Sequence, residues 1–541
     1  MSAAVRISDD ALARACGADE VAAAFEAAGA AVERVSSWGM HWLEPLVEIE
    51  GIGFRNASAV EAPGILVRHA ELVSASIPPP AQVERAAEWT LKQVQGDNDC
   101  IGYVELHPFI AGQHRLTFAR AGRTRPLSLE DYAATGGWAG LKRARKIGPQ
   151  QILAEVLQSG LRGRGGAGFP AGIKWQTVAN APGARKYVVC NADEGDSGTF
   201  ADRMLIEGDP FQLIEGMAIA AHAVSADKGF VYLRSEYPDA IRKMEAALEL
   251  AAPLIAPFAI ELRIGAGAYV CGEETSLLNS IEGRRGEVRA KPPLPAIEGL
   301  FGCPTLVNNV LTLAAVPHIL CDGGAAHYAS LGSGRSKGTT PVQLAGNIRH
   351  GGLYETAFGI TLRQLVYDIG GGTASGRAVK AVQVGGPLGA YIHPDQFDLP
   401  FDYEAYAGAD ALIGHGGIVM FDDTADMAAL ARFAFQFCAA ESCGKCTPCR
   451  IGAVRGAEVI DRIRSGGREP DRIELAPQMH NTVKSARAQG EQVRLLEELC
   501  EVMRDGSLCA LGGFTPYPVL SALMHWPQDF GITALEPSDE L

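Results

Sequence analysis

The stretch Gly160–Trp175 (GLRGRGGAGFPAGIKW) sets the expectation for the middle of this 541-residue chain. Its glycines lack Cβ atoms, so the backbone can approach a phosphate closely and line it with N–H groups. Arg162, Arg164 and Lys174 add positive charge within the same stretch. These features predict a loop that cradles a phosphate group. The alternative is a flexible surface loop, which the interleaving of glycines with arginines disfavours.

The same stretch satisfies the G-x-G-x-x-G expression at Gly163, Gly165 and Gly168, but that match is weak by itself. In an ordinary dinucleotide-binding fold a strand directly precedes the glycines, and an acid follows about 20 residues later. Here a helix is predicted from Pro149, and the first acid downstream is Asp193. We therefore reject the ordinary Rossmann interpretation and keep the phosphate-binding one.

Downstream of this loop, apolar strand-like runs alternate with helical stretches. The runs lie at 186–190 (KYVVC), 229–233 (GFVYL) and 260–264, with helical patterns between them at 210–223 and 238–251. Strands that alternate with helices are typical of an α/β sheet. The region around the Gly-rich loop is therefore predicted to be an α/β domain.

Two loops that follow these strands are candidate binding segments, because ligands of open α/β sheets bind beyond the carboxyl ends of the strands. The first, 191–196 (NADEGD), carries three acids, which would repel phosphate and suit ribityl hydroxyls, a flavin ring or a nicotinamide amide. Its alternative is a solvated acidic turn. The second, 265–275 (GAGAYVCGEET), is ambiguous, because acids in the first turn of a helix also complement the helix dipole.

The run 443–449 (CGKCTPC) places three cysteines at C-x2-C-x2-C spacing, which matches the first three ligands of the bacterial ferredoxin type of iron–sulfur site. Zinc is the second choice, since zinc sites usually present separated C-x2-C pairs. Cys438 on the preceding helix, Cys500 on an apolar helix face and Cys509 in a loop compete to be the fourth ligand. The loop position favours Cys509. The other cysteines among the twelve are expected to be small buried hydrophobes.

Composition limits the class of partner and the compartment. The chain has 48 Lys+Arg against 63 Asp+Glu, a net charge of −15, which argues against nucleic acid as a partner. The start shows no signal peptide, and no run approaches the roughly 20 apolar residues that a membrane-spanning helix needs. We therefore expect a cytoplasmic protein without membrane insertion. Thiols stay reduced in the cytoplasm, so a group of cysteines there indicates a metal site more than disulfides.

The N-terminal part differs from the rest. Residues 1–67 are predicted to form a small α/β unit, with a helix at about 19–34 and a strand near 42–49, which Pro45 would place at a sheet edge. Residues 68–100 fit neither neighbour and indicate an inserted loop. Beyond the central region, the sequence predicts a Gly-rich part at 340–420, with short strands and one helix at 362–367. A helical part follows at 425–530.

Six linked motifs resemble the NADH-oxidising flavoprotein subunit of complex I and its relatives over roughly 135–530: GLRGRGGAGFPAGIKW, CNADEGDSGTFADR, GAGAYVCGEET, KPPLPAIEGLFG, PTLVNN and ESCGKCTPCR. The resemblance implies a multidomain α/β protein. Its expected domains are a degenerate thioredoxin-like domain at 1–120 with 68–100 as an insertion, an FMN- and NAD-binding α/β domain at 135–335, a ubiquitin-like β domain of the soluble-ligand-binding (SLBB) type at 336–422, and a helical bundle with one [4Fe–4S] cluster at 423–530.

The resemblance also implies roles for individual residues. FMN would be held by Gly163, Arg164, Gly165, Lys174, Asn191, Asp193, Tyr269, Gly272, Glu273, Asn308 and Asn309. NAD(H) would meet Gly166, Ala167, Phe169, Lys174, Glu194, Asp196, Glu274 and Lys291, with Glu194 and Asp196 positioning the nicotinamide. The cluster would be ligated by Cys443, Cys446, Cys449 and Cys509. Thr177 and Leu294 stand where some members have Phe, which puts adenine stacking in doubt.

Further stretches resemble the β subunit of NAD-dependent, molybdenum-containing formate dehydrogenase: WLEPLVEIEG, HRLTFARAG, VQVGGPLGAY, FDLPFDYEAY and SLCALGGFTPYPVLSAL. This implies a molybdenum- and iron–sulfur-containing catalytic subunit and a small [2Fe–2S] thioredoxin-like subunit as partners. The N-terminal domain has only Cys16 and Cys100, too few for a [2Fe–2S] cluster of its own. The alternatives are the diaphorase subunit of an NAD-reducing hydrogenase, the complex I flavoprotein subunit, and a non-enzymatic, zinc-stapled assembly module.

Overall fold

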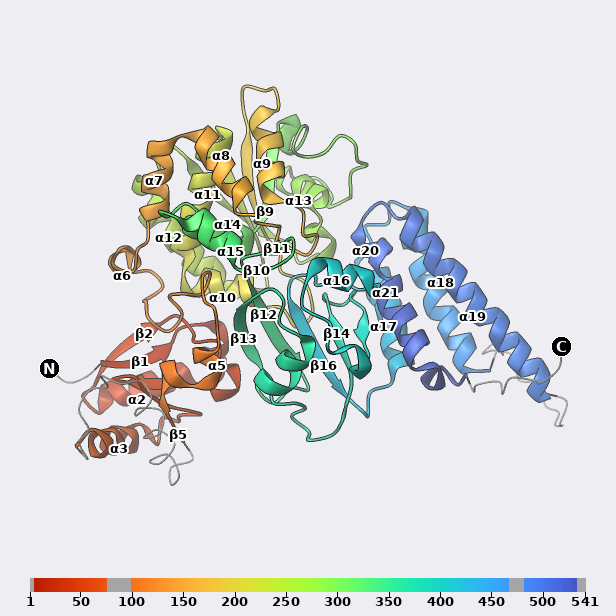
Figure 1. Ribbon diagram of the computed structural model, residues 1–541, viewed down its shortest axis with the longest axis horizontal. Coiled ribbons are helices and arrows are strands. Elements are labelled where there is room, and N and C mark those ends of the chain that lie inside the picture. The colour runs from red at the N-terminus through yellow and green to blue at the C-terminus, as the bar shows by residue number, and fades with distance from the viewer. Residues whose placement is uncertain (1–3, 75–98, 467–480, 533–541) are drawn as a thin grey trace.

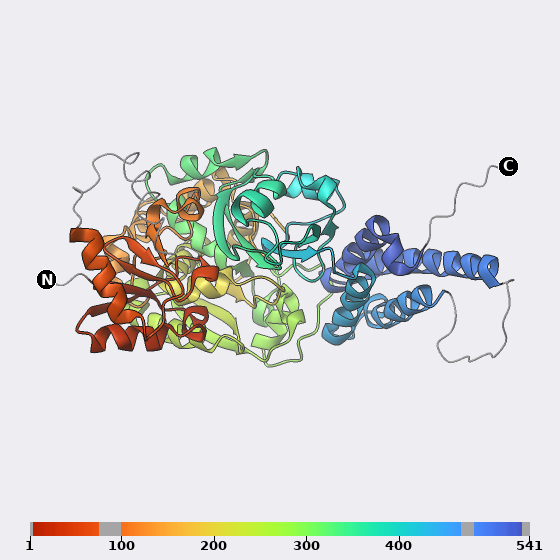
Figure 2. The ribbon, with the colours of Figure 1, turned by 90° about the horizontal axis from the view of Figure 1, so that it is seen from below.

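The computed structural model describes residues 4–74, 99–466 and 481–532. Figure 1 shows an N-terminal sheet region in red, a central α/β region in orange to green, a β-rich region in teal and C-terminal helices in blue. Seen from below, the C-terminal helices project from the body on the side away from the N-terminal sheet (Figure 2). Among the described helices, none is long and apolar enough to cross a membrane.

The central region is built on a four-stranded parallel sheet with the order β8-β7-β6-β9. Its strands are β6 (Tyr187–Ala192), β7 (Lys228–Arg234), β8 (Ala259–Gly265) and β9 (Thr305–Asn309). The helices of this region are α7 (Ala139–Ile147), α8 (Pro149–Gln158), α9 (Ala171–Asn180), α10 (Ala201–Gly208), α11 (Pro210–Val224), α12 (Pro238–Ile255), α13 (Glu274–Ile281), α14 (Val310–Ile319) and α15 (Gly324–Ser330). The predicted strands and helices between 186 and 264 are confirmed to within a few residues.

Both faces of β6, which lies inside this parallel sheet, are buried, but they face different cores. Val188 and Cys190 point into a core shared with α11 and α14. Tyr187 and Val189, on the opposite face of β6, belong to a core that continues into the C-terminal helices. The C-terminal helices are therefore packed onto the central region through shared apolar side chains.

The N-terminal sheet has the order β2-β1-β3-β4-β5, and only the β1–β2 pair is parallel. Its elements are β1 (Ala4–Ser8), α1 (Ala11–Ala15), α2 (Ala18–Ala27), β2 (Ala31–Val35), β3 (Val47–Ile49), β4 (Ile52–Phe54), α3 (Ala62–Ser74) and β5 (Cys100–Tyr103). The short helices α5 (Pro108–Ala111) and α6 (Leu129–Ala134) lead into the central region.

Two predictions for this part are wrong. The helix expected at about 19–34 ends at Ala27, because Gly29 turns the chain with a φ of 84° and 31–35 pairs with β1 as a strand. The strand expected near 42–49 is reduced to β3, which lies inside the sheet between β1 and β4. Pro45 precedes that strand and therefore removes no hydrogen bond from the ladder.

The predicted insertion at 68–100 falls mainly on 75–98, outside the described residues. At its edges the chain is part of the N-terminal fold, since α3 runs through Ser74 and β5 starts at Cys100. Leu72 on α3 packs against the N-terminal core. The described ends of the predicted insertion, 68–74 and 99–100, are therefore part of the N-terminal fold.

The β-rich region forms a mixed five-stranded sheet with the order β13-β12-β16-β14-β15. Its elements are β10 (Gly332–Ser333), β11 (Ser336–Lys337), β12 (Thr339–Gly346), β13 (Gly352–Ala357), β14 (Val379–Val384), β15 (Tyr391–Ile392), α16 (Tyr403–Gly408) and β16 (Gly417–Asp422). The helix expected at 362–367 is a π-helix, Gln364–Ile369. The C-terminal helices are α17 (Met427–Glu441), α18 (Thr447–Arg464), α19 (Asn481–Gly506), α20 (Ala510–Phe514) and α21 (Pro516–His525).

Candidate functional site

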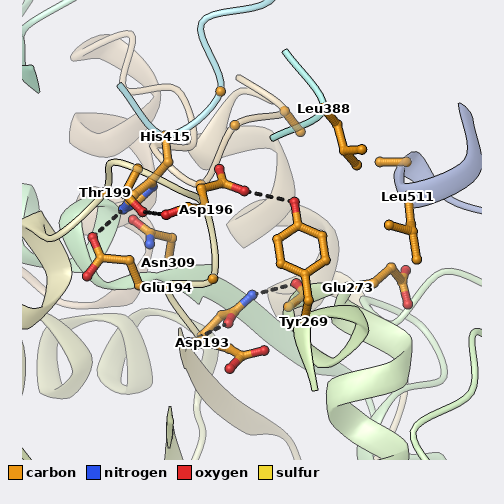
Figure 3. Close-up of a pocket in the computed structure, with 18 of the residues that line it drawn as sticks. Asp193, Glu194, Asp196, Thr199, Tyr269, Glu273, Asn309, Leu388, His415 and Leu511 are labelled. Atoms are coloured by element: carbon orange, nitrogen blue, oxygen red, sulfur yellow. Dashed lines mark hydrogen bonds and ion pairs between the residues drawn. The ribbon is translucent and has the colours of Figure 1, made fainter. Parts of the chain in front are cut away.

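Two adjoining cavities open at the carboxyl ends of β6 and β9, where the central sheet meets loops of the β-rich region and α20. The first, here called the acid-lined cavity, has a volume of about 280 Å³ (Figure 3). The second, the lysine-lined cavity, has a volume of about 390 Å³. Both are lined by Gly165, Ala167, Asn191, Gly272 and Asn309. Shared lining makes them two parts of one site.

The Gly-rich loop is folded back on itself beside both cavities. The amide of Gly163 donates to the carbonyl of Phe169 over 2.8 Å. Gly166 and Gly168 adopt φ values of 106° and 60°, which glycine reaches without the steric cost of a Cβ atom. The predicted loop therefore forms a bare backbone wall: Gly163, Gly165, Gly166, Ala167, Gly168 and Phe169 line the cavities.

The arginines of the loop do not face the cavities. Arg164 is buried, and its guanidinium donates to the carbonyls of Lys337 and Thr339 and to the hydroxyl of Tyr328. Arg162 pairs with Glu404 at 2.6 Å. The structure thus assigns both side chains to holding the loop against the β-rich region, and it does not bring the predicted Arg164 guanidinium to the cofactor site.

Lysines supply the positive charge of the site. Lys174 Nζ lies 3.3 Å from Glu274 Oε2, and Lys291 Nζ lies 2.8 Å from Glu273 Oε1 and 3.1 Å from Glu274 Oε1. Burial alone would raise the pKa of Glu274, but the two lysines outweigh it and lower that pKa. The predicted residues Lys174, Glu274 and Lys291 therefore stand together on the wall of the lysine-lined cavity, and Glu273 lines the acid-lined cavity.

The acids of the NADEGD loop line the acid-lined cavity, as predicted from their place after β6. Burial raises the pKa of Asp193 to about 7, and its Oδ2 atom has no hydrogen-bond partner among the described residues. Asp196 accepts a hydrogen bond of 2.8 Å from Tyr269, and burial raises its pKa (Figure 3). Glu194 is fully enclosed. Burial therefore favours the protonated forms of Asp193 and Asp196, whereas the lowered pKa of Glu194 favours its ionised form.

Three predicted asparagines are fixed by the surrounding chain. Asn191 donates to the carbonyl of Gly272 over 2.8 Å, so the two predicted loops are tied together. Asn308 accepts from the indole N–H of Trp175 over 2.9 Å. Asn309 accepts from the amide of Leu311 at the start of α14, and its side-chain nitrogen donates to Asp202 Oδ2 over 2.7 Å.

Several lining residues were not predicted. His415, Leu388 and Leu412 come from loops of the β-rich region, and Thr199 and Asp202 follow the NADEGD loop. The only sequence signal for His415 is its place within GHGG (414–417), directly before a strand. Pattern reasoning missed this residue because the glycines assign the loop to a turn and do not show which sheet the loop packs against.

The candidate cluster ligands gather at the N-terminus of α18 and at α20. Cys446 and Cys509 occupy the N-cap positions of these helices, and Cys449 lies in the first turn of α18. A hydrogen bond from Cys438, 3.7 Å away, lowers the pKa of Cys449, and Ser442 and Cys446 contribute. A helix N-terminus also favours a thiolate. Cys509 faces the acid-lined cavity, whereas Cys438 and Cys500 are wholly buried in the core.

Comparison with known proteins identifies the two halves of this site. Residues 156–318 match the model of the Nuo51 FMN-binding domain, and residues 429–532 match that of the NADH-ubiquinone oxidoreductase-F iron-sulfur binding region. The NADH-quinone oxidoreductase F 2 subunit of Rhizobium meliloti (strain 1021) is 41% identical over 74% of this chain and 93% of its own length. The chain belongs to the family of complex I F subunits.

Two other proteins extend the similarity to this family. The NADP-reducing hydrogenase subunit HndC of Solidesulfovibrio fructosivorans is 43% identical over 77% of this chain and 83% of its own length. A chain in the crystal structure of an NAD⁺-reducing [NiFe]-hydrogenase in the H₂-reduced state is 30% identical, with a TM-score of 0.66. That comparison covers 99% of this chain and 85% of the other, so it includes the N-terminal sheet region.

The family's cofactors are FMN and a [4Fe–4S] cluster, with NADH as substrate. The cavity walls fit them: bare glycine backbone suits a phosphate, and the unpartnered Asp193 Oδ2 offers a buried acceptor to a ring or ribityl hydroxyl. Cysteines at two helix N-termini suit iron. Zinc as the ion of this cysteine set is not supported by the family.

Proposed function

We propose that this chain is the NAD(H)-linked subunit of an NAD-dependent formate dehydrogenase, in which it passes electrons between iron–sulfur clusters and NAD by way of FMN. One observation carries the electron-transfer role. Cys509, which we assign to the cluster, lines the same acid-lined cavity as the Gly-rich loop and the NADEGD loop. Flavin and cluster would therefore adjoin each other within one chain.

The residue roles are those that the family resemblance implies, and every residue assigned below to FMN or NAD(H) lines one of the two cavities. We assign FMN to Gly163, Gly165, Lys174, Asn191, Asp193, Tyr269, Gly272, Glu273, Asn308 and Asn309. NAD(H) is assigned to Gly166, Ala167, Phe169, Lys174, Glu194, Asp196, Glu274 and Lys291, and the cluster to Cys443, Cys446, Cys449 and Cys509. Arg164 takes a supporting role in this scheme, because its guanidinium is bonded to the β-rich region.

The protein chain itself positions the cofactors and shields them from water. FMN supplies the exchange between two-electron hydride chemistry and one-electron cluster chemistry. The Asn191–Gly272 hydrogen bond fixes the two loops on either side of the site. The apolar core that β6 shares with the C-terminal helices fixes the position of the cysteines relative to the cavities. The domain limits 1–120, 135–335, 336–422 and 423–530 remain our division of the chain.

The formate assignment rests on the sequence stretches that resemble a formate dehydrogenase β subunit. A hydrogenase diaphorase is the second candidate, because a chain of an NAD⁺-reducing [NiFe]-hydrogenase matches nearly the whole length of this one. Isolating the chain with its native partners distinguishes the two. We expect a molybdenum-containing partner and formate-dependent NAD⁺ reduction. Nickel in the partner, with hydrogen-dependent NAD⁺ reduction, would establish the second candidate.

The cluster assignment is tested by single cysteine variants. Cys509→Ser is expected to lose the iron while FMN and NADH-dependent dye reduction remain, because the flavin site does not need the thiolate. Cys500→Ala is the matched control, since Cys500 is a buried cysteine of the same bundle. Iron content and FMN content are measured in both. A Cys509→Ser protein with full iron content would refute the ligand set.

A further inference from the structure

His415 connects the β-rich region to the wall of the acid-lined cavity through both of its ring nitrogens. It stands in a loop before β16 and is buried with 8% exposure. Its Nδ1 lies 2.8 Å from the carbonyl oxygen of Arg164 in the Gly-rich loop. Its Nε2 lies 3.1 Å from Asp202 Oδ1 and 3.5 Å from Glu194 Oε1. The residue lines the acid-lined cavity (Figure 3).

These partners fix where the protons of the ring must be. A carbonyl oxygen only accepts, so Nδ1 carries a hydrogen. Nε2 faces carboxylate oxygens, which also only accept when ionised. Neither Nε2 nor Asp202 Oδ1 makes a hydrogen bond in the described part of the chain, and Nε2 faces only the carboxylates of Asp202 and Glu194. A lone pair on each atom at 3.1 Å would repel, and therefore one further proton belongs between them.

The acids on the far side are themselves held in place. Glu194 accepts from the amides of Asp202 and Arg203, both over 3.0 Å. These bonds and His415 overcome the effect of burial and lower the pKa of Glu194. Asp202 Oδ2 accepts from Asn309 over 2.7 Å, while burial raises the pKa of Asp202 to about 6.

Other charged or titratable groups face this cluster from neighbouring elements. Tyr237 on the α12 side donates to Glu194 Oε2 over 3.3 Å, and the Arg234 guanidinium at the end of β7 donates to the Glu194 carbonyl. Asp196 faces His415 from the NADEGD loop. Burial disfavours a charged His415, but Asp202 and Glu194 outweigh it and raise the pKa of His415 well above its usual value.

We propose that Nε2 of His415 holds the proton that the NAD half-reaction takes up and releases, with Asp202 as its partner and Glu194 as the fixed counter-charge. The inference rests on the proposed function, and it gives a role to a group that the electron path alone leaves unused. His415 is brought to the flavin wall by the β-rich region, which would then contribute directly to the chemistry.

The balance of the half-reaction requires such a group. NAD⁺ becomes NADH by gaining two electrons and one proton, whereas a cluster delivers electrons alone. In the reducing direction the Nε2–H bond breaks and its electron pair stays on Nε2. The proton would be taken up by the flavin after it has received two electrons from the cluster, and the flavin would then supply that proton and the electron pair to NAD⁺ as hydride. His415 is left neutral and regains a proton from solvent. NADH oxidation runs the exchange backward, and the neutral imidazole accepts the proton at Nε2.

The first test locates the proton without using the activity. Histidine labelled with ¹⁵N is observed in protein prepared without FMN and in FMN-loaded protein at pH 7, and the His415→Gln spectrum identifies the signals of His415. We expect both ring nitrogens to be protonated. Asp202→Asn should leave hydrogen only on Nδ1, because the amide donates to Nε2. A wild-type His415 without hydrogen on Nε2 would overturn the proposal.

The second test measures proton delivery. His415→Gln should retain FMN but reduce NAD⁺ about 100-fold more slowly in single-turnover experiments with chemically reduced protein, in the range of general acid–base effects. The pH dependence of that rate should disappear. His350→Gln is the control, since His350 lies in the same region with Nδ1 3.1 Å from a carbonyl, that of Ile369.

The outcomes distinguish a failure of the His415 proposal from a failure of the proposed function. A wild-type rate and pH profile in His415→Gln would exclude His415 as the proton-holding group. A protein that binds no FMN would end the proposed function, while the ¹⁵N spectra would still decide where the proton lies. If His415→Gln fails to fold, Asp202→Asn carries the kinetic test with the same expected slowing.

Discussion

Asp193 shows how one buried carboxyl of the acid-lined cavity affects stability. Its Oδ2 is unpartnered among the described residues, and its nearest cation, Arg234 Nε, lies 3.8 Å from Oδ1. Burial raises its pKa from 3.8 to about 7. The folded protein therefore binds a proton at this site more tightly than the unfolded chain does. This stabilisation is complete below about pH 4 and is lost as the pH rises toward and through 7.

Asp193→Asn should remove this pH dependence. The amide cannot ionise, so the variant should gain about 1–4 kcal/mol over the wild type at pH 8 and little at pH 4. Urea unfolding of FMN-free protein at the two pH values measures the difference. Equal effects at both pH values would show that folding does not raise the pKa of Asp193.

At the scale of elements, α11 and α14 pack unusually closely in the core behind the sheet. A Cβ atom placed at Gly216 of α11 would lie only 2.0 Å from the backbone oxygen of Leu313 in α14. A backbone atom of a packed helix cannot move aside easily. The glycine therefore sets the distance between the helices, and α14 begins directly after Asn309 at the site.

Gly216→Ala is accordingly expected to destabilise the protein by about 1–3 kcal/mol or more, through overpacking. Gly490→Ala is the matched control: Gly490 lies at an exposed position of α19 with no described atom within 4 Å of its Cβ position, so alanine should stabilise that helix by up to about 1 kcal/mol. Thermal unfolding of both variants compares them. Similar melting temperatures would contradict the close packing of α11 and α14.

Sequence patterns predicted elements where one physical signal dominated. The apolar runs of β6, β7 and β8 follow their patterns closely. The Ala-rich run at 19–34 misled, because alanine favours helix but a turn at Gly29 and pairing with β1 decided the outcome. His415 and Asp202 were missed because the contact between two regions of the chain, which no local pattern encodes, creates their cluster.

At the scale of the whole molecule, the N-terminal region is joined to the central region by buried ion pairs. Lys243 of α12 donates to the carbonyl of Glu207, and its Nζ lies 3.1 Å from Asp9 Oδ2. Arg203 pairs with Glu207 at 2.9 Å, and Glu207 accepts from the amide of Ala11 over 2.8 Å. These contacts reach α10, whose first turn contains Asp202 and Arg203, the residues whose amides donate to Glu194.

Lys243→Met should therefore loosen the N-terminal region, at a cost of about 1.5–3 kcal/mol, because it removes a buried charged hydrogen-bond donor while Arg14 still pairs with Asp9 at 2.6 Å. Lys228→Met is the control, since its pair with Glu261 is partly exposed and contributes little. Hydrogen exchange of peptides from residues 4–35 reports the effect. Unchanged protection in Lys243→Met would show that apolar packing alone joins the two regions.

The proposed function requires FMN and an iron–sulfur cluster that exchange electrons within this chain. The most direct measurement is an anaerobic NADH titration of the purified protein, with FMN and iron quantified and the flavin absorbance and cluster EPR signal followed together. We expect one FMN and one [4Fe–4S] cluster per chain. NADH should reduce the flavin, and electrons from the flavin should then reach the cluster. A protein with FMN and iron in which NADH reduces neither group would contradict it.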